Sequence, residues 1–316
     1  MNAILLHFGM NMWDKQDTDL LMGEKSGYDT KLALEKEVWE RVTNALPSCG
    51  IDTVLIDLGE GVKLDSHPEL AIEGSWSKED FRAELDRLRS IGLTPLPKFN
   101  FSCGHNAWMK DYAYMVGTKI YDQVCCDVVA ETIELFDTPE FFHLGMEEEN
   151  LGCQKKHPVK IIRSPEKKIL DCKLLFDLCR AKGVRPWIWM DIDTLEAFGG
   201  EETFRREIPK DVLVSNWYYH EFPNPFIGGE VANAKYQARI KLYDKLGEWG
   251  YDQVPTSSTW CLPYNTLNTM EYCKEHATRV VGYMTAPWMK TTEDYYYGLM
   301  HDAYTFGVAK RKVFGK

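Results

Sequence analysis

Residues 141–149 read FFHLGMEEE, and this stretch decides how the fold is interpreted. Residues 141–146 form a short apolar run, which predicts a buried strand of a parallel sheet. Three glutamates, Glu147, Glu148 and Glu149, follow at once. Ligands of parallel α/β sheets bind outside the carboxyl ends of the strands. The acidic run therefore indicates a functional site at the end of this strand.

Runs of similar length recur along the whole chain and alternate with stretches of helical periodicity. The predicted strands cover residues 4–8, 53–58, 94–99, 141–146, 186–192, 212–217, 253–259 and 280–286. Successive β-α units without a composition break or a Ser/Pro-rich linker predict one α/β domain. We expect a single (β/α)8 TIM barrel over residues 1–316, with no accessory domain. A doubly wound open sheet is the alternative.

Two of the intervening helices have clear start signals. The first begins with the capping pattern of Ser77 to Asp80 and ends at Gly92. Its apolar face consists of Phe81, Leu85, Leu88 and Ile91. The second begins at Ser164, with Pro165 in its first turn.

Charge and composition argue against several classes of function. The chain has 316 residues, a net charge of −11 and a pI near 5.3, which opposes binding to nucleic acid or to acidic lipid surfaces. A neutral or cationic small molecule fits this charge better. No glycine-rich phosphate loop follows the first predicted strand, so we expect no nucleotide cofactor, and we expect no bound metal.

The cysteines and the N-terminus suggest a cytoplasmic protein. Nine cysteines are scattered from Cys49 to Cys273 without paired metal-type spacing, which indicates reduced thiols. Adjacent Cys125 and Cys126 are expected to be small buried side chains. Residues 1–6 lack a basic region and are interpreted as a first strand rather than a signal peptide. No stretch approaches the ~18 apolar residues of a membrane span.

Polar and aromatic residues gather at the ends of the predicted strands. In chain order they are Asp57, Glu60, Asn100, His105, Glu147, Glu148, Trp189, Asp191, Asp193, Trp217, Trp260 and Trp288. A sugar ring has apolar C–H faces that stack on indole and a hydroxyl rim that needs polar partners. The four tryptophans and the carboxylates therefore predict a carbohydrate site, although each tryptophan could instead pack between barrel and helix.

Glycoside cleavage requires a carboxylic acid that protonates the leaving oxygen, and Glu148 is the candidate. Neighbouring strand residues point to opposite faces, so Glu147 and Glu148 share a pocket only if the strand ends before them. The alternative is that all three glutamates form a solvated loop edge.

The segment 143–148, HLGMEE, resembles the His-x-Gly-Gly-Asp-Glu strand end of the family-20 glycoside hydrolases, the β-N-acetylhexosaminidases. Residues 67–70 (HPEL), 74–80 (GSWSKED) and 104–105 (GH) are also similar to that family. The resemblance covers nearly the whole chain. It implies that Glu148 is the general acid, that Glu147 takes the place of the acetamido-orienting aspartate, and that Asp57, His105 and Glu148 form a proton-tuning triad.

The departures from the family pattern fall on substrate recognition. Glu147 is one methylene longer than the family's aspartate, and Cys261 replaces a tyrosine, although Tyr264 lies nearby. The strand-one arginine is missing, because the first arginine is Arg41, and Met289-Lys290 replaces an acidic residue. The identity of the sugar is therefore left open.

The leading hypothesis is an exo-acting, retaining β-glycosidase that hydrolyses a terminal β-linked (amino)sugar, with Glu148 as acid/base. The expected sugar-binding residues are Asn100, Trp189, Asp191, Trp217, Trp260, Tyr264 and Trp288. A metal-dependent sugar isomerase or lyase would use Glu147 or Glu148 with Asp191, His105 and Asp57 as ligands. A third hypothesis is a non-catalytic carbohydrate-binding barrel. The expected partner is a small-molecule carbohydrate, neither nucleic acid nor a membrane is expected as a partner, and a homo-oligomer is left open.

Overall fold

The computed structural model describes residues 1–12, 29–152, 154, 159–220, 222 and 230–315. Eight parallel strands form one sheet in the order β6-β5-β4-β3-β2-β1-β8-β7. They are β1 (Asn2–His7), β2 (Thr53–Asp57), β3 (Thr94–Lys98), β4 (Phe141–His143), β5 (Arg185–Trp189), β6 (Leu213–Ser215), β7 (Thr256–Ser257) and β8 (Tyr283–Thr285). Isolated parallel bridges link Val214 to Gln253 and Trp217 to Thr256, so the sheet curls into a nearly closed barrel. The (β/α)8 prediction is confirmed, and the open-sheet alternative is wrong.

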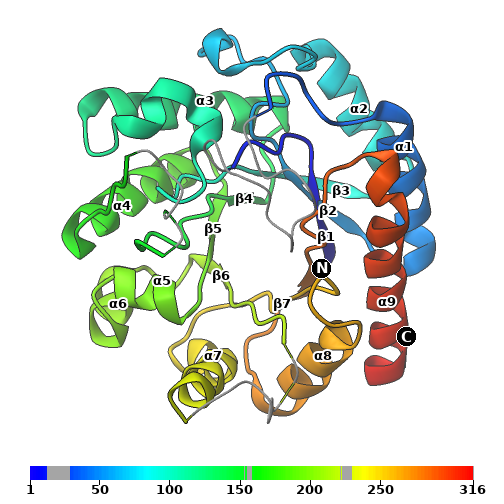
Figure 1. Cartoon of the computed structure of the whole chain (residues 1–316), viewed down its shortest axis with the longest axis vertical. Helices are drawn as coiled ribbons and strands as arrows, with labels where there is room; N and C mark the ends of the chain where they lie inside the picture. Colours follow the sequence, from blue (N-terminus) through cyan, green and yellow to red (C-terminus); the bar gives the residue numbers. More distant parts are fainter. Residues whose placement is uncertain (13–28, 153, 155–158, 221, 223–229, 316) are drawn as a thin grey trace.

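Helices surround the barrel on the outside (Figure 1). They are α1 (Lys36–Ala45), α2 (Lys78–Ser90), α3 (Lys119–Leu135), α4 (Pro165–Ala181), α5 (Ile192–Ala197), α6 (Glu201–Glu207), α7 (Glu230–Glu248), α8 (Asn265–His276) and α9 (Tyr296–Phe314). Short 3-10 turns cover Leu46–Cys49, Pro68–Leu70, Ala107–Tyr114 and Glu293–Tyr295. The last helix, α9, packs against α8 and α1 and so completes the outer ring.

The helix start signals in the sequence are confirmed. The Ser77 side chain accepts a hydrogen bond from the Asp80 backbone N–H at the start of α2, and Ser164 caps α4 in the same way through the Lys167 N–H. Such caps satisfy backbone donors that have no partner inside the helix. Gly92, with φ of 86°, follows the end of α2 as expected.

All eight predicted strands exist, but β4, β6, β7 and β8 are shorter than their apolar runs. In β4 the ladder ends at His143, because Gly145 and Met146 have φ of 75° and 74° and leave the strand conformation. In β7 only Thr256–Ser257 is strand, although Gln253 still forms single bridges to both neighbouring segments.

Alternate strand residues divide into two cores. Outward side chains such as Ile4, Val54 and Ile56 pack under the helices. Inward side chains such as Leu5, Leu55 and Leu96 fill the barrel near its N-terminal end. Two residues further along these strands, the next inward positions are polar. His7 lies opposite Asp57, Asp57 opposite Lys98, and Lys98 opposite His143. This buried polar layer lies toward the strand ends that carry the acidic run.

Within the described ranges, no helix combines the length and apolar character of a membrane span. The eight cysteines that the structure describes are all free thiols, as expected. Cys125 is buried and Cys126 is partly buried, both in α3. Cys153 lies outside the described residues.

Candidate active site

The acidic run lies on a loop rather than on the strand. After β4 ends, Gly145, Met146 and Glu148 all have positive φ, of 75°, 74° and 48°. This backbone breaks the alternation of a strand, and both Glu147 and Glu148 face one cavity. The condition for the two carboxylates to share a pocket is therefore met.

His105 lies between these two carboxylates. Its Nδ1 is 3.3 Å from Glu147 Oε1, and its Nε2 is 3.2 Å from Glu148 Oε2. The Asn100 side chain, at the end of β3, donates a 2.7 Å hydrogen bond to Glu147 Oε1 and orients that carboxylate. One imidazole thus contacts both acidic groups, one through each ring nitrogen.

Contacts at this site shift the pKa values of His105 and Glu148. Burial alone would lower the pKa of His105, but the contacts with Glu147 and Glu148 outweigh burial and raise it to about 10. Burial raises the pKa of Glu148, whereas the hydrogen bond and charge of His105 and the charge of Arg239 lower it, and the net shift is downward. At neutral pH the proton therefore resides on His105, and Glu148 is a carboxylate.

A cavity of about 230 Å³ opens beside these groups. Its lining consists of His105, Glu147, Glu148, Trp189, Trp217, Tyr219, Trp260 and Trp288. The polar groups form one edge and aromatic rings form the rest. A larger hollow of about 660 Å³ lies on the outer surface along α7 and α8, away from the strand ends, so we place the candidate site at the smaller cavity.

The aromatic wall is held by ring contacts and one hydrogen bond. Trp217 and Tyr219 stack with centroids 5.2 Å apart and planes 25° apart, and Trp260 meets Tyr219 edge-on at 6.4 Å. The Trp288 indole N–H donates a 3.0 Å hydrogen bond to the Tyr219 hydroxyl. Trp189 packs 6.0 Å from Trp288. All four tryptophans singled out in the sequence thus lie at one cavity, and their binding of sugar stays a prediction.

Asp57 is not where the expected triad requires it. Its Oδ2 accepts a 2.6 Å hydrogen bond from Lys98 and lies 3.3 Å from His7 Nδ1, and all three side chains are buried in the polar layer of the barrel. Burial raises the pKa of Asp57, but Lys98 and His7 outweigh burial and lower it to about 2. The carboxylate that contacts Nδ1 of His105 is that of Glu147. The Asp57–His105 contact is therefore wrong, because Lys98 on β3 takes Asp57 as its counter-ion.

Glu60 is also turned away from the cavity. Its carboxyl accepts hydrogen bonds from the backbone N–H groups of Met10 (3.0 Å) and Asn11 (3.1 Å). Burial, only partly offset by these bonds, raises its pKa to about 7. It fixes the loop after β1 to the loop after β2.

Asp191 and Asp193 support the wall from behind. Asp191 caps α5 through the Thr194 N–H, and it lies 3.1 Å from the Arg239 guanidinium of α7. Asp193 contacts the same guanidinium at 2.5 Å. Arg239 in turn lies over the Trp217 ring, 4.7 Å from its centroid. Asp191 is thus paired behind the tryptophan and does not line the cavity.

Tyr264 does not approach the site. Its side chain is 68% exposed at the start of α8, and neither it nor Cys261 lines the cavity. The described aromatic hydroxyl in the cavity lining belongs instead to Tyr219.

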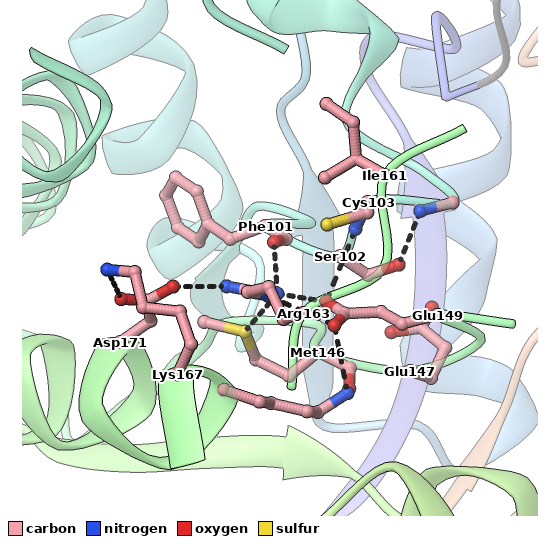
Figure 2. A network of polar contacts seen from close by, with 12 residues as sticks. Phe101, Ser102, Cys103, Met146, Glu147, Glu149, Ile161, Arg163, Lys167 and Asp171 are labelled. Atoms are coloured by element: carbon pink, nitrogen blue, oxygen red, sulfur yellow. Dashed lines mark hydrogen bonds and ion pairs between the residues drawn. The ribbon is translucent and has the colours of Figure 1, made fainter. Parts of the chain in front are cut away.

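The third glutamate of the run, Glu149, points away from the cavity into a buried ionic cluster (Figure 2). It forms an ion pair with Arg163 and lies 3.5 Å from Lys168 Nζ. Glu147 and Glu149 are each 4% exposed. The alternative of a solvated loop edge is therefore wrong, and the position of Glu149 outside the cavity agrees with the sequence interpretation.

Sequence reasoning missed three residues that shape the site, Tyr219, Arg239 and Arg163. Tyr219 had a usable signal, because in extended backbone it lies two residues from Trp217 and on the same face. Arg239 and Arg163 lie on or beside helices, where nothing in the local pattern shows that a basic side chain turns inward.

The ligand set of the metal-dependent alternative is not assembled. Asp57 pairs with Lys98 and Asp191 with Arg239. Over the residues that the structure describes, no group of three or more His, Cys, Asp or Glu side chains is arranged to hold a metal ion.

Two positions without side chains allow the loops to approach each other. A Cβ on Gly104, next to His105, would lie 2.6 Å from the Glu148 carbonyl oxygen. A Cβ on Gly145 would collide with Asn100, which orients Glu147. The β3 and β4 loops are therefore in direct contact around the candidate acid.

No protein-family model matches this sequence, and no curated protein matches it. Solved structures do match. The chain aligns over 96% of its length with a β-N-acetylhexosaminidase from Bacteroides fragilis, at 12% identity and a TM-score of 0.62, and covers 65% of that chain. A pneumococcal exo-β-D-N-acetylglucosaminidase module aligns over 99%, at 15% identity and a TM-score of 0.64, with 84% of that chain covered.

Dispersin B matches over 98% of both chains, at 11% identity and a TM-score of 0.57. A family-5 endo-β-1,4-glucanase from Bacillus licheniformis matches over 99% of this chain and 60% of its own, at 13% identity and a TM-score of 0.59. At these identities the likeness concerns the fold. The chain thus resembles the catalytic barrel of the family-20 glycoside hydrolases, and spans less than two thirds of the B. fragilis enzyme.

Proposed function

We propose that this protein is an exo-acting, retaining β-glycosidase that hydrolyses a terminal β-linked (amino)sugar, with Glu148 as its acid/base. The observation that carries the proposal is the contact of one histidine, His105, with both Glu147 and Glu148 at the edge of an aromatic cavity. The glycoside-hydrolase barrels among the structural neighbours support the same reaction class.

The cavity is suited to one sugar ring. Its volume of about 230 Å³ is below the roughly 300–1,000 Å³ of pockets that hold larger ligands. The indole rings that line the cavity offer apolar surface for C–H groups, while Glu147 and Glu148 offer acceptors for hydroxyl or amino groups. A site of this size favours removal of a terminal residue.

Proton transfer involves Glu148 and His105 together. In the resting site the proton is on His105 Nε2, next to the Glu148 carboxylate. A sugar that covers Glu148 removes its water and favours its neutral form, so the proton moves from Nε2 to the carboxylate. Glu148 then gives this proton to the glycosidic oxygen as the C–O bond breaks. Restored as a carboxylate, Glu148 takes a proton from the water that completes hydrolysis.

Glu147 acts at the neighbouring part of the sugar. Asn100 holds its Oε1, whereas its buried Oε2 has no hydrogen-bond partner in the described structure, and the residue lines the cavity. As the glycosidic bond breaks, the anomeric carbon gains a bond either to a carbonyl oxygen of a 2-substituent that Glu147 orients or to Glu147 itself as nucleophile, and water then displaces that oxygen. A glycosyl-enzyme trapped with a 2-fluoro sugar would assign the nucleophile role to Glu147.

The test is hydrolysis of a panel of aryl β-hexosaminides and aryl β-hexosides. Glu148→Gln should lower kcat on a cleaved substrate by on the order of 10²–10⁴-fold, as removal of a general acid/base does. Glu140→Gln, an exposed glutamate just before β4, is the matched control and should leave kcat unchanged. Absence of cleavage by the wild type, or full activity of Glu148→Gln, would contradict the proposal.

A carbohydrate-binding barrel without turnover is the second candidate. One observation favours it, because the pKa of Glu148 is lowered rather than raised, which keeps the acid ionised in the resting site. Its signature is binding of a monosaccharide, measured by calorimetry, with no product formed and with the affinity unchanged in Glu148→Gln.

A further inference from the structure

A buried ionic cluster surrounds Glu149, the residue after the candidate acid (Figure 2). Its members are Glu149, Arg163, Lys168 and Asp171, and each is at most 6% exposed. Arg163 forms an ion pair with Glu149 and donates a 3.0 Å hydrogen bond to Asp171. None of these side chains lines the cavity.

The cluster is bonded to the backbone of both loops that carry the site. On the β3 loop, Arg163 Nη2 donates to the Phe101 carbonyl at 3.1 Å, and Glu149 Oε1 accepts from the Cys103 N–H at 3.3 Å. On the β4 loop, Lys168 Nζ donates to the Met146 carbonyl at 2.8 Å. These contacts lie within four residues of His105 and directly before Glu147.

The β4 loop needs such contacts to keep its shape. Met146 and Glu148 are non-glycine residues with φ of 74° and 48°. Left-handed backbone of this kind costs on the order of 1–3 kcal/mol per residue and persists only where surrounding contacts hold it. Lys168 binds the carbonyl of one of these residues, so loss of the cluster would allow the loop to relax.

Stability alone is a weak reason for a buried cluster of four charges. Well-packed apolar residues of similar volume often stabilise a fold at least as well as buried ion pairs. The contacts of charged groups are directional, unlike those of apolar groups, because each hydrogen bond fixes a particular backbone atom. The cluster of Glu149, Arg163 and Lys168 fixes backbone on both sides of the His105–Glu148 contact.

We propose that Arg163 is a positioning residue that, together with Glu149 and Lys168, sets the placement of His105 against Glu147 and Glu148. This proposal rests on the proposed function for its kinetic consequences. Its structural consequence, the placement of His105 between two carboxylates, is measured independently of activity.

The experiment compares Arg163→Met and Lys168→Met with Arg180→Met. Arg180 also forms several hydrogen bonds, to Asp177 and Asp211, but on the surface of α4, so its variant is the matched control. The two cluster variants should lose roughly 10- to 100-fold in kcat, as misplacement of reacting groups by about 1 Å does, with KM changed by less than about threefold. Arg163→Lys, which keeps the charge, should retain more of kcat than Arg163→Met.

The second readout is the titration of His105, followed by NMR of labelled histidine and assigned with His105→Gln. The pKa of about 10 should fall toward the ordinary value of about 6.5 in the cluster variants, because the imidazole moves away from its carboxylates, and stay unchanged in Arg180→Met. Wild-type kcat per folded molecule together with an unchanged His105 pKa would overturn the proposal.

Two further outcomes are distinguished by the same set of variants. If Arg163→Met does not fold, Lys168→Met answers the question, since it removes the Met146 contact, the more distant approach to Glu149 and a contact with the Phe198 ring, but leaves the Arg163–Glu149 pair in place. If the wild type cleaves no substrate, the proposed function fails, and the His105 titration alone decides the positioning proposal.

Discussion

The two sides of the barrel mouth are built in different ways. On the β3–β4 side, His105, Glu147 and Glu148 lie on loops bonded to a buried ionic cluster, with left-handed backbone held under them. On the β6–β7 side, Trp217, Tyr219 and Trp260 form an aromatic wall where the sheet closes through isolated bridges. Groups that exchange a proton need fixed directions, whereas rings that stack on a sugar need area. The two sides should therefore respond differently to mutation.

The largest effect on stability is expected at Asp57. This residue ends β2 and pairs with Lys98 of β3, in the polar layer below the β3–β4 side. Asp57→Asn leaves the fully buried Lys98 without a counter-charge, which should cost about 3–5 kcal/mol of unfolding free energy. Asp86→Asn removes only a surface ion pair with Arg89 and should cost under about 0.5 kcal/mol. Urea denaturation measures both. A loss below about 1 kcal/mol in Asp57→Asn would show that the ionic side tolerates change as well as the aromatic side.

The pH dependence of the same side follows from the pKa shift of Asp57. Its folded-state pKa of about 2 lies below its ordinary value of 3.8, so its contribution to stability is present above about pH 4. That contribution should be lost as the pH falls through about 2. Stability curves of the wild type and Asp57→Asn, measured between pH 5 and 2, should converge at the acid end; parallel curves would contradict the assignment.

The contribution of His105 to stability should depend on pH in the opposite direction, because it is lost as the pH rises. Its folded-state pKa of about 10 lies above the ordinary 6.5, so its stabilising contribution is complete below about pH 6.5 and declines as the pH rises through 10. The difference in unfolding free energy between wild type and His105→Asn should shrink over this window. His276→Asn, on the surface at the end of α8, is the control. A difference that is constant with pH would mean that His105 is not held as a cation.

A smaller and different effect is expected on the aromatic side. Trp260→Leu removes a stacking surface, and the ~0.5–1.5 kcal/mol of an aromatic contact corresponds to a KM increase of about two- to tenfold with little change in kcat. Trp249→Leu, on the outer side of the barrel between Arg205 and Lys245, is the control and should leave KM unchanged. A fall in kcat at constant KM for Trp260→Leu would show that the wall also positions reacting groups.

The smallest effect concerns Tyr264. Because this side chain is 68% exposed and does not line the cavity, Tyr264→Ala should change kcat/KM by less than about twofold, as surface substitutions do. Initial rates on any cleaved substrate measure this. A tenfold loss would show that Tyr264 takes the role of the family tyrosine that Cys261 replaces.

The barrel and the acidic site could be predicted because their signals are local. Each strand is visible in the sequence as an apolar run, and Ser77 and Ser164 are residue types that favour helix starts. The pairing of Asp57 could not be predicted in this way, because it depends on the barrel register that places Lys98 beside it. A lysine at the end of the short run 94–98 has no local feature that turns it inward.

The shared pocket of Glu147 and Glu148 could be predicted only in part from the sequence. The sequence identified the condition, a strand that ends before the glutamates, and the left-handed backbone at Gly145 and Met146 meets it. A non-glycine residue such as Met146 is an unusual choice for that conformation, so its backbone could not be foreseen from residue type. Contacts from Lys168, twenty-two residues further along the chain, account for it.

The close approach of the β3 and β4 loops has a consequence for genetics. Gly104 and Gly145 have no side chain that could touch a substrate, yet any Cβ at either position collides with the other loop. In a saturation library selected for activity, these two codons should therefore tolerate as few replacements as those of the glutamates themselves. The number of tolerated replacements at each codon would therefore identify the loop contact as clearly as it identifies the acidic groups.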